Sequence, residues 1–378
     1  MMLSGIYLTL AGQDLFAGSA REMVAGPGSI ALFNSSYRAA IADPLNALTK
    51  DIRIGSDFRY HIMEQKNSTD QRKWSGIDTH IYGMIPLFNI SGKARPSGLF
   101  FRVLSLQNSG SGSGLSSYNE LANGSDVVEK NTRNEYHIGT SIALENSWMF
   151  SLNLIHVRIQ ASLDEQSVIA LSNREEQNLY HESQVGSMTY PEYGLKVKLS
   201  RDTSVAVQYS EGFSNRSGQT VAFRNQFLDS EDTGVLARPL YQPGSLTTAF
   251  KTRILRETTL TGGIRKSFAV DVRRDDGQLI KLAKEFSSLG ISLEHRFKFA
   301  GKTWFPGLGL RTMTDKTNEA AFGLGIRAGL LDFDLALIQT IKNDPDDKRN
   351  QFSASMGLGY RFGDSAKKKK EKAKVRKT

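Results

Sequence analysis

The stretch "FSASMGLGYRF" (352–362) decides the fold of this chain. Strict alternation of this kind predicts a β-strand with one apolar face. The strand ends on two aromatic residues, Tyr360 and Phe362, and "GDSAKKKKEKAKVRKT" (363–378) follows at once. A lysine run cannot continue an apolar face, so the sheet must end at residue 362. The apolar residues of this strand are Phe352, Ala354, Met356, Leu358, Tyr360 and Phe362.

The same alternation runs through most of the chain. Patterns of helical period are scarce, so the sequence predicts an all-β protein. Fourteen strands are expected, at about 51–63, 77–85, 98–106, 134–144, 147–158, 189–200, 203–211, 247–255, 258–272, 286–298, 302–312, 319–328, 330–341 and 351–362.

The connections between these strands are unequal in a regular way. Those after every second strand are short, as at 145–146 and 256–257, with the connection at 86–97 as an exception that is too long for its side. The long ones are 64–76, 107–133, 159–188, 212–246 and 273–285. Short turns at one end and long loops at the other are typical of an outer-membrane barrel, and an even strand number brings both termini to the periplasmic side. Alternation alone also fits a soluble sandwich. We therefore predict a single antiparallel transmembrane β-barrel of about fourteen strands, spanning 51–362, in a bacterial outer membrane.

Composition narrows the class of protein further. The chain has 378 residues, no cysteine and a formal charge of +9. Residues 363–378 carry seven Lys and one Arg against Asp364 and Glu371, a net of +6, which leaves +3 for the rest. The basic character therefore belongs to a periplasmic tail and does not predict nucleic-acid binding. The absence of cysteine excludes disulfides, cysteine-ligated metals and thiol nucleophiles.

Two segments precede the first strand. Residues 1–20 have a short apolar stretch and a small-residue ending, so they are either a signal remnant or an N-terminal extension. Residues 21–50 show no strand pattern. A barrel of fourteen strands is wide enough to accept a plug, since about eight strands already fill with side chains alone. We predict a plug at 21–50; a mobile periplasmic extension is the alternative.

The plug segment "GPGSIALFNSSYRAAIADPLNAL" (26–48) resembles the N-terminal hatch of the FadL-type long-chain fatty-acid transporter family, and that of related outer-membrane barrels of the type IX secretion shuttle kind. The matching stretch is Ala39-Ala40-Ile41-Ala42-Asp43, and Asn46-Ala47-Leu48 stands where the family has Asn-Pro-Ala. The resemblance implies a porin-like barrel with a hatch inside it, to which Ser35, Tyr37, Asp43 and Asn46 belong. FadL-type members pass hydrophobic substrates, whereas shuttle-type members dock partner proteins.

Charged residues on the strands are expected to face the lumen, because Arg or Lys facing lipid near the midplane costs roughly 2–4 kcal/mol. They form either a salt-bridged wall or a polar constriction that selects solutes. The candidate lumen-lining residues are Arg265, Asp271, Arg273, Glu294, Arg296, Arg327, Asp332, Asp334 and Arg361.

No motif for catalysis, a cofactor or a metal accompanies this pattern. His61, His80 and His137 lie on early strands and could share the lumen, but nothing at a telling spacing completes a hydrolytic site. The resemblance to the FadL-type family implies passive uptake of small hydrophobic or amphipathic solutes by a barrel whose outer face contacts membrane lipid. The alternative is a docking barrel that binds a periplasmic or surface protein through its long loops or through the tail at 363–378.

Overall fold

The computed structural model describes residues 52–66, 71–87, 97–114, 125–144, 147–171, 174–225, 230–273, 279–344 and 347–362. No helix among them is long and apolar enough to cross a membrane. The strands in chain order are β1 (Ile52–Lys66), β2 (Gln71–Leu87), β3 (Ser97–Gly114), β4 (Ser125–Ala143), β5 (Trp148–Leu171), β6 (Arg174–Lys198), β7 (Thr203–Ser210), β8 (Phe213–Asn225), β9 (Ser230–Gln242), β10 (Ser245–Leu255), β11 (Thr258–Ser267), β12 (Val270–Arg273), β13 (Leu279–Ala283), β14 (Phe286–His295), β15 (Phe297–Phe299), β16 (Lys302–Met313), β17 (Thr317–Ala328), β18 (Leu331–Asp344) and β19 (Asp347–Phe362).

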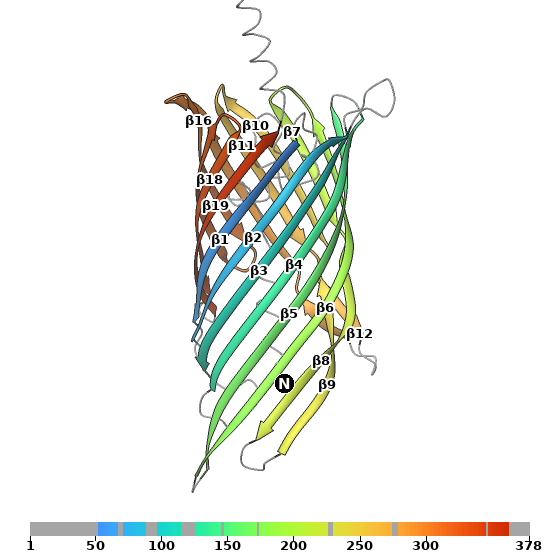
Figure 1. The fold of residues 1–378 in the computed structure, drawn as a ribbon, viewed down its shortest axis with the longest axis vertical. Coiled ribbons are helices and arrows are strands. Elements are labelled where there is room, and N and C mark those ends of the chain that lie inside the picture. Colours follow the sequence, from blue (N-terminus) through green and yellow to red (C-terminus); the bar gives the residue numbers. More distant parts are fainter. Residues whose placement is uncertain are drawn as a thin grey trace, which may run out of the picture.

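The sheet closes on itself through its first and last strands. β1 pairs antiparallel with β19 from Ile52 opposite Phe362 to Lys66 opposite Lys348. Each wall strand also runs antiparallel to its other neighbour, so the result is a barrel of fourteen strands, as predicted (Figure 1). β15 continues β14, while the β8–β9 and β12–β13 hairpins are additions to the wall. Closure pairs the backbone groups of the terminal strands and leaves the wall without an exposed edge.

The alternation that predicts the strands also sets the two faces of the wall. On β1, Ile54, Phe58 and Ile62 are 43–46% exposed, whereas Asp57 and His61 between them are buried. Exposed apolar side chains recur on the outside of all the wall strands. This outward apolar band is the surface of a barrel wall that faces lipid.

The beginning of β1 and the end of β19 lie at the same end of the barrel, here called the terminal end, and the opposite end is called the loop end (Figure 1). Turns at the terminal end are short, apart from the connection between Leu87 of β2 and Ser97 of β3: Leu255 and Thr258, Phe299 and Lys302, and Ala328 and Leu331 are the last and first residues of successive strands. The predicted short turns are therefore confirmed. The predicted plug, with Ser35, Tyr37, Asp43 and Asn46, and the tail at 363–378 lie outside the described residues.

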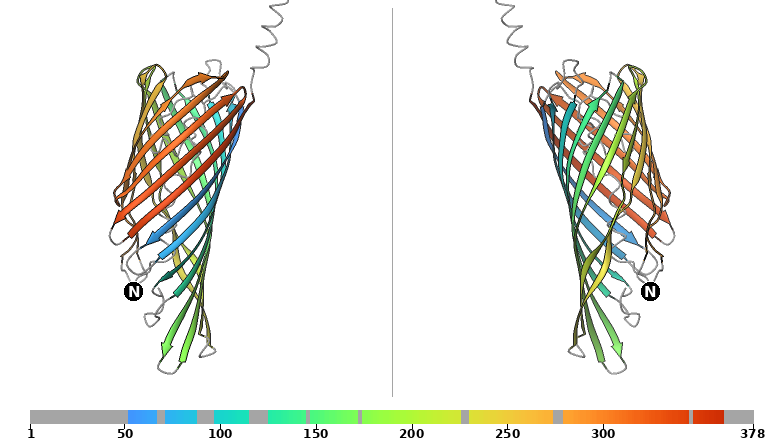
Figure 2. Two further views of the ribbon diagram at one scale, coloured as in Figure 1. Left: turned by 90° about the vertical axis from the view of Figure 1, so that its left-hand side faces the viewer. Right: turned by 90° about the vertical axis from the view of Figure 1, so that its right-hand side faces the viewer.

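The long connections are a correction to the sequence prediction. Residues 107–133, 159–188 and 212–246 are mostly strand, because β3–β4, β5–β6 and β8–β9 extend as hairpins past the apolar band (Figure 2). Likewise, the strand expected at 258–272 ends at Ser267, and β12 belongs to a separate hairpin. Where their side chains are described, as on β4 and β5, the outer faces of these extensions are mostly polar and resemble loops, but ladder hydrogen bonds satisfy their backbone groups.

One kink separates the wall from an added hairpin. β7 and β10 pair up to Ser210 opposite Ser245, and β8 and β9 resume with Phe213 opposite Gln242. Between them Gly212 and Gly244 face each other so closely that a Cβ on either would lie 2.8–2.9 Å from the backbone nitrogen of the other. Glycine is required for this close approach. The kink directs the side chain of Phe213 onto a cluster on β5 and β6.

Candidate functional site: the inner wall of the barrel

The inner face of β5 changes character along the strand. Near the terminal end its outward side chains are apolar, from Trp148 to Leu154, and Asn153 on the inner face is buried. Beyond Leu154 the pattern reverses: His156 and Arg158 point outward and are exposed, while Ile155, Val157 and Ile159 are buried. β5 therefore leaves the lipid-facing band near residue 155 and continues into water with its apolar face turned inward.

This reversed stretch belongs to a larger inner apolar patch. Register places Ile155 opposite Tyr190 and Val157 opposite Met188 of β6. All are at most 6% exposed, and Phe213 at the start of β8 packs against them. Burying such a side chain favours the folded position by about 1.5–3 kcal/mol. We define the inner apolar patch as Ile155, Val157, Ile159, Met188, Tyr190 and Phe213.

A polar network lies directly beside this patch on β4. His137 is opposite Ile155, Glu135 opposite Val157 and Arg133 opposite Ile159. Arg133 Nε donates to Glu135 Oε1 at 2.7 Å, and His137 Nε2 lies 2.9 Å from Glu135 Oε2. An amphipathic inner wall results, with a polar face on β4 and an apolar face on β5 and β6.

The network continues from β4 into other strands. Asn153 on β5 contacts His137 Nδ1 at 3.2 Å and donates to Glu192 Oε1 of β6 at 3.2 Å. Arg133 also donates to the Gln242 side chain at the end of β9, at 3.0 Å. These contacts connect three wall strands and the base of the β8–β9 hairpin. Buried polar groups satisfied in this way hold the wall in one arrangement.

Two further charged clusters lie on the inner wall. Arg59 on β1 pairs with Asp78 on β2, whose carboxylate also lies 3.7 Å from His61 Nδ1. Arg102 on β3 contacts His80 at 3.2 Å. The prediction that His61, His80 and His137 share the lumen is confirmed, since all three are buried on inward faces. Among the described residues, no group of three or more His, Cys, Asp or Glu side chains could hold a metal ion.

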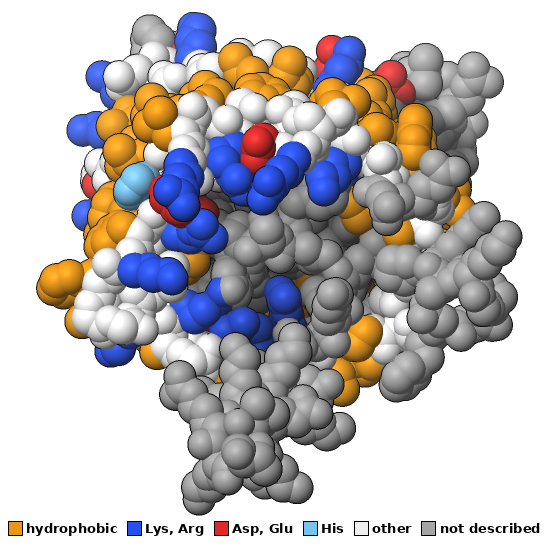
Figure 3. Space-filling model, turned by 90° about the horizontal axis from the view of Figure 1, so that it is seen from above, with side chains coloured by type: hydrophobic (Ala, Val, Ile, Leu, Met, Phe, Trp, Pro, Cys, Tyr) orange, Lys and Arg blue, Asp and Glu red, His pale blue; other side chains and the backbone are white. Residues whose placement is uncertain are grey.

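Four of the predicted lumen residues lie close together near the terminal end. Arg327 Nε and Arg361 Nε lie 3.1 and 3.4 Å from the two carboxylate oxygens of Asp332, which is buried. Arg361 also donates to the carbonyl oxygen of Gly329 at 2.7 Å. Asp334 follows two residues later on the same inner face of β18 and is partly buried. This arrangement is a salt-bridged wall, and Figure 3 shows Lys and Arg side chains gathered around the mouth at this end.

The other five predicted residues are dispersed. Arg265 is inward on β11 and reaches Ser245 at 3.4 Å, and Glu294 is half-buried on the inner face of β14. Arg296 is 45% exposed and pairs with Glu257 at a turn, so it lies on the rim of the terminal end. Hydrogen bonding from Arg296 lowers the pKa of Glu257. Asp271 is exposed on β12, outside the barrel sheet, and Arg273 is the last residue of β12. Arg296 therefore lies on the rim between β14 and β15, and Asp271 lies on the β12–β13 hairpin, so the structure places neither on the inner wall where the sequence led us to expect them.

Sequence reasoning missed the charged residues of the β4 network. Arg133 fell in a segment interpreted as a loop, and Glu135 and Glu192 sit on strands whose inner face was not followed beyond the band. A usable signal was present in β5, where the adjacent apolar residues Leu154 and Ile155 mark the switch of the apolar face from even to odd positions. Such a switch is what a strand requires when it leaves lipid and turns its apolar side inward.

These features define the class of the protein: a closed transmembrane β-barrel whose inner wall carries both a charged network and an apolar surface. Within that class the fold is the FadL-type barrel, which confirms the resemblance noted in the sequence.

This assignment of the fold rests on similarity to solved structures. The Pseudomonas putida toluene transporter TodX has a TM-score of 0.65 at 12% identity, over 92% of this chain and 99% of that one. The Ralstonia pickettii toluene transporter TbuX gives 0.60 at 13% identity, over 93% and 100%. A Pseudomonas aeruginosa FadL homologue gives 0.61 at 9% identity, over 94% and 96%. No protein-family model matches the chain, and no curated protein sequence matches it. At these identities the likeness is one of fold.

Proposed function

We propose that this protein is a passive outer-membrane uptake channel for small hydrophobic or amphipathic solutes, with both termini in the periplasm. The inner apolar patch carries the proposal. It lies on the loop-end side of the lipid-facing band, so a solute from outside would reach it at Phe213, the one patch residue that is not fully buried. Desolvation of apolar surface there is favourable at about 25 cal/mol per Å² buried.

The polar network on β4 makes this entry site amphipathic. A solute that lies along β5 and β6 has the Arg133–Glu135–His137 network at its side. An amphipathic solute can therefore bury its apolar part while its polar group stays beside hydrogen-bonding partners, which avoids the cost of an unpaired buried polar group. Movement down a concentration gradient needs no cofactor and no catalytic group.

The described functions of the similar structures support this proposal: TodX and TbuX are toluene transporters, and a third structure is a FadL homologue. A shared fold does not by itself transfer function. The weight therefore rests on the patch, and the experiment is directed at it.

A pair of matched variants tests the patch. Val157→Asp places a charge within it, whereas Gln160→Asp places the same charge on the outward, exposed face of the same strand. In cells with an intact outer membrane that produce the chain, we expect uptake of the fluorescent hydrophobic dye N-phenylnaphthylamine to fall about tenfold with Val157→Asp, equivalent to about 1.4 kcal/mol. Gln160→Asp should leave the rate unchanged. Equal rates for both variants and for cells without the chain would overturn the proposal.

A docking barrel remains the alternative function, and deletion of residues 363–378 separates it from uptake. Under the uptake proposal the deletion leaves dye entry unchanged, because the tail follows the last wall strand. Under the docking alternative, the deletion releases a co-purifying acidic protein while the Val157→Asp variant retains it.

A further inference from the structure

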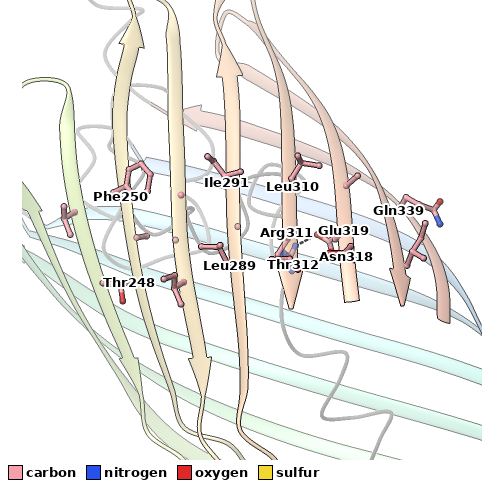
Figure 4. Close-up of a pocket in the computed structure, with 18 residues that line it drawn as sticks. Thr248, Phe250, Leu289, Ile291, Leu310, Arg311, Thr312, Asn318, Glu319 and Gln339 are labelled. Atoms are coloured by element: carbon pink, nitrogen blue, oxygen red, sulfur yellow. Dashed lines mark hydrogen bonds and ion pairs between the residues drawn. The ribbon is translucent and has the colours of Figure 1, made fainter. Parts of the chain in front are cut away.

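The outward face of the wall is not uniform: a groove of about 770 Å³ crosses it from β7 to β18 (Figure 4). Most of its lining side chains belong to the exposed band, among them Ile264, Leu289 and Leu310 at 52–64% exposure. The groove is therefore a feature of the lipid-facing surface and is separate from the inner wall described above.

Two rows of cross-strand partners form this groove. Register aligns the first row as Phe250, Gly262, Ile291, Leu310, Ala320 and Gln339. The second row, one pleat nearer the loop end, consists of Thr248, Ile264, Leu289, Thr312, Asn318 and Ile341. Side chains two residues apart on one face of a strand are separated by roughly 7 Å. Both rows are continuous because the six strands are in unbroken antiparallel register.

Small residues make the depression. Gly262 and Ala320 interrupt the first row, and the ring of Phe250 lies against Gly262, where a Cβ would be 2.6 Å from it. Between the two rows the backbone of Gly263 opposite Gly290 forms the floor. Small residues thus leave open a space that larger side chains on neighbouring strands would fill.

The surroundings identify the occupant. Exposed apolar side chains adjoin the groove, such as Leu293 and Leu308 toward the terminal end and Leu337 on β18, so the medium around it is the hydrocarbon of a bilayer. Its second row carries Thr248, Thr312 and Asn318, which is the polar character expected near lipid headgroups. Five inter-strand spacings give each row a length of roughly 24 Å, and one leaflet is about 15 Å of hydrocarbon. One extended acyl chain therefore fits along the rows.

We propose that this groove binds one acyl chain of a lipid in the leaflet at the loop end, with the headgroup beside Thr312 and Asn318. The lipid fills the space over Ala320 and over the floor at Gly263 and Gly290, beside the Phe250 ring that covers Gly262, and is retained more firmly than the lipids that surround the rest of the band. This site does not depend on the uptake function, only on the barrel's position in a membrane.

Retained lipid can be counted directly. The chain is reconstituted in vesicles of palmitoyl-oleoyl-phosphatidylethanolamine, transferred to detergent, and examined by native mass spectrometry. We expect one lipid per chain to persist. Ala320→Trp, which fills the first row, should reduce the lipid-bound fraction about tenfold, whereas Ala354→Trp, at an outward position of β19 outside the groove, should not.

Three outcomes would overturn the proposal. One is equal lipid retention by the three proteins; another is retention so weak that the native chain carries none. The third is displacement of the lipid by millimolar toluene, which would make the groove a solute site. Leu310→Trp serves as a second filling variant if Ala320→Trp fails to fold, and folding is checked by heat-modifiable migration in gel electrophoresis.

Discussion

The two halves of the barrel wall are built to different lengths. From β1 to β6 the strands have 15 to 25 residues, whereas β10, β11, β14, β16, β17 and β18 have 10 to 14. A tilted strand needs only about 9–11 residues to cross a bilayer. The short half therefore spans the membrane and little more, while the long half continues beyond it.

The inner faces differ in the same way. The long half carries the β4 network and the inner apolar patch, whereas the short half carries compact ion pairs, Arg311 with Glu319 and Arg327 with Asp332, beside small buried residues such as Ala249 and Ala336. On the short half the distinctive feature is on the outside, the groove over Gly262. The proposed solute site and the proposed lipid site thus lie on opposite halves of one closed sheet.

The largest effect should come from breaking the β4 network. Glu135→Leu removes the acceptor of Arg133 and His137, both buried, so roughly 3–5 kcal/mol of stability should be lost. On the short half, Ser288→Ala removes a buried hydroxyl that makes no hydrogen bond with any described residue, so stability should stay nearly unchanged. Urea unfolding in detergent micelles measures both. Similar costs would show that the charged network does not distinguish the two halves.

A second prediction locates the membrane boundary on β5 itself. Leu152 is 48% exposed within the outward apolar band, and Leu152→Arg should cost roughly 2–4 kcal/mol in lipid vesicles. Gln160, eight residues further on the same outward face, is already among polar neighbours, so Gln160→Arg should change stability by less than about 0.5 kcal/mol. If both arginines cost the same, β5 does not leave the band and the assignment of the inner apolar patch to the aqueous side fails.

The sequence was sufficient for the wall and insufficient for the extensions. Strict alternation, as in residues 286–298 and 351–362, located the fourteen wall strands because one face meets lipid throughout. Beyond Leu154 on β5 that rule no longer applies, because the outer face meets water and the apolar side chains lie on the inner face. Polar residues on the outer face of β5 beyond Leu154 then resemble a loop.

The site was predicted unevenly for the same reason. The inward position of Arg327, Asp332 and Arg361 follows from strand parity within the band. The partners of the Arg133–Glu135–His137 network could not be predicted, because Asn153, Glu192 and Gln242 are brought to it by register between strands that the sequence does not order. The groove could not be predicted either, because it depends on which residues of six strands lie opposite one another. That register is set only when the sheet closes.

The smallest effect concerns one ion pair at the terminal end. Arg296 and Glu257 form an exposed rim pair, unlike the buried Asp332 pairs inside the mouth. The pKa of Glu257 is lowered because Arg296 donates a hydrogen bond to its carboxylate. A lowered folded-state pKa contributes stability above the ordinary value of 4.5, and the contribution is lost as pH falls through the folded-state pKa.

Because both side chains are largely solvated, Glu257→Gln should leave the urea midpoint at pH 7 unchanged. The shift itself is visible by NMR titration of the glutamate side-chain carboxyl carbons, with Glu257 assigned by its absence in Glu257→Gln. In Arg296→Gln the Glu257 signal should titrate at higher pH than in the native chain. A native titration at or above 4.5 would mean that the rim pair does not form, and the comparison between exposed rim and buried mouth would then rest on the Asp332 cluster alone.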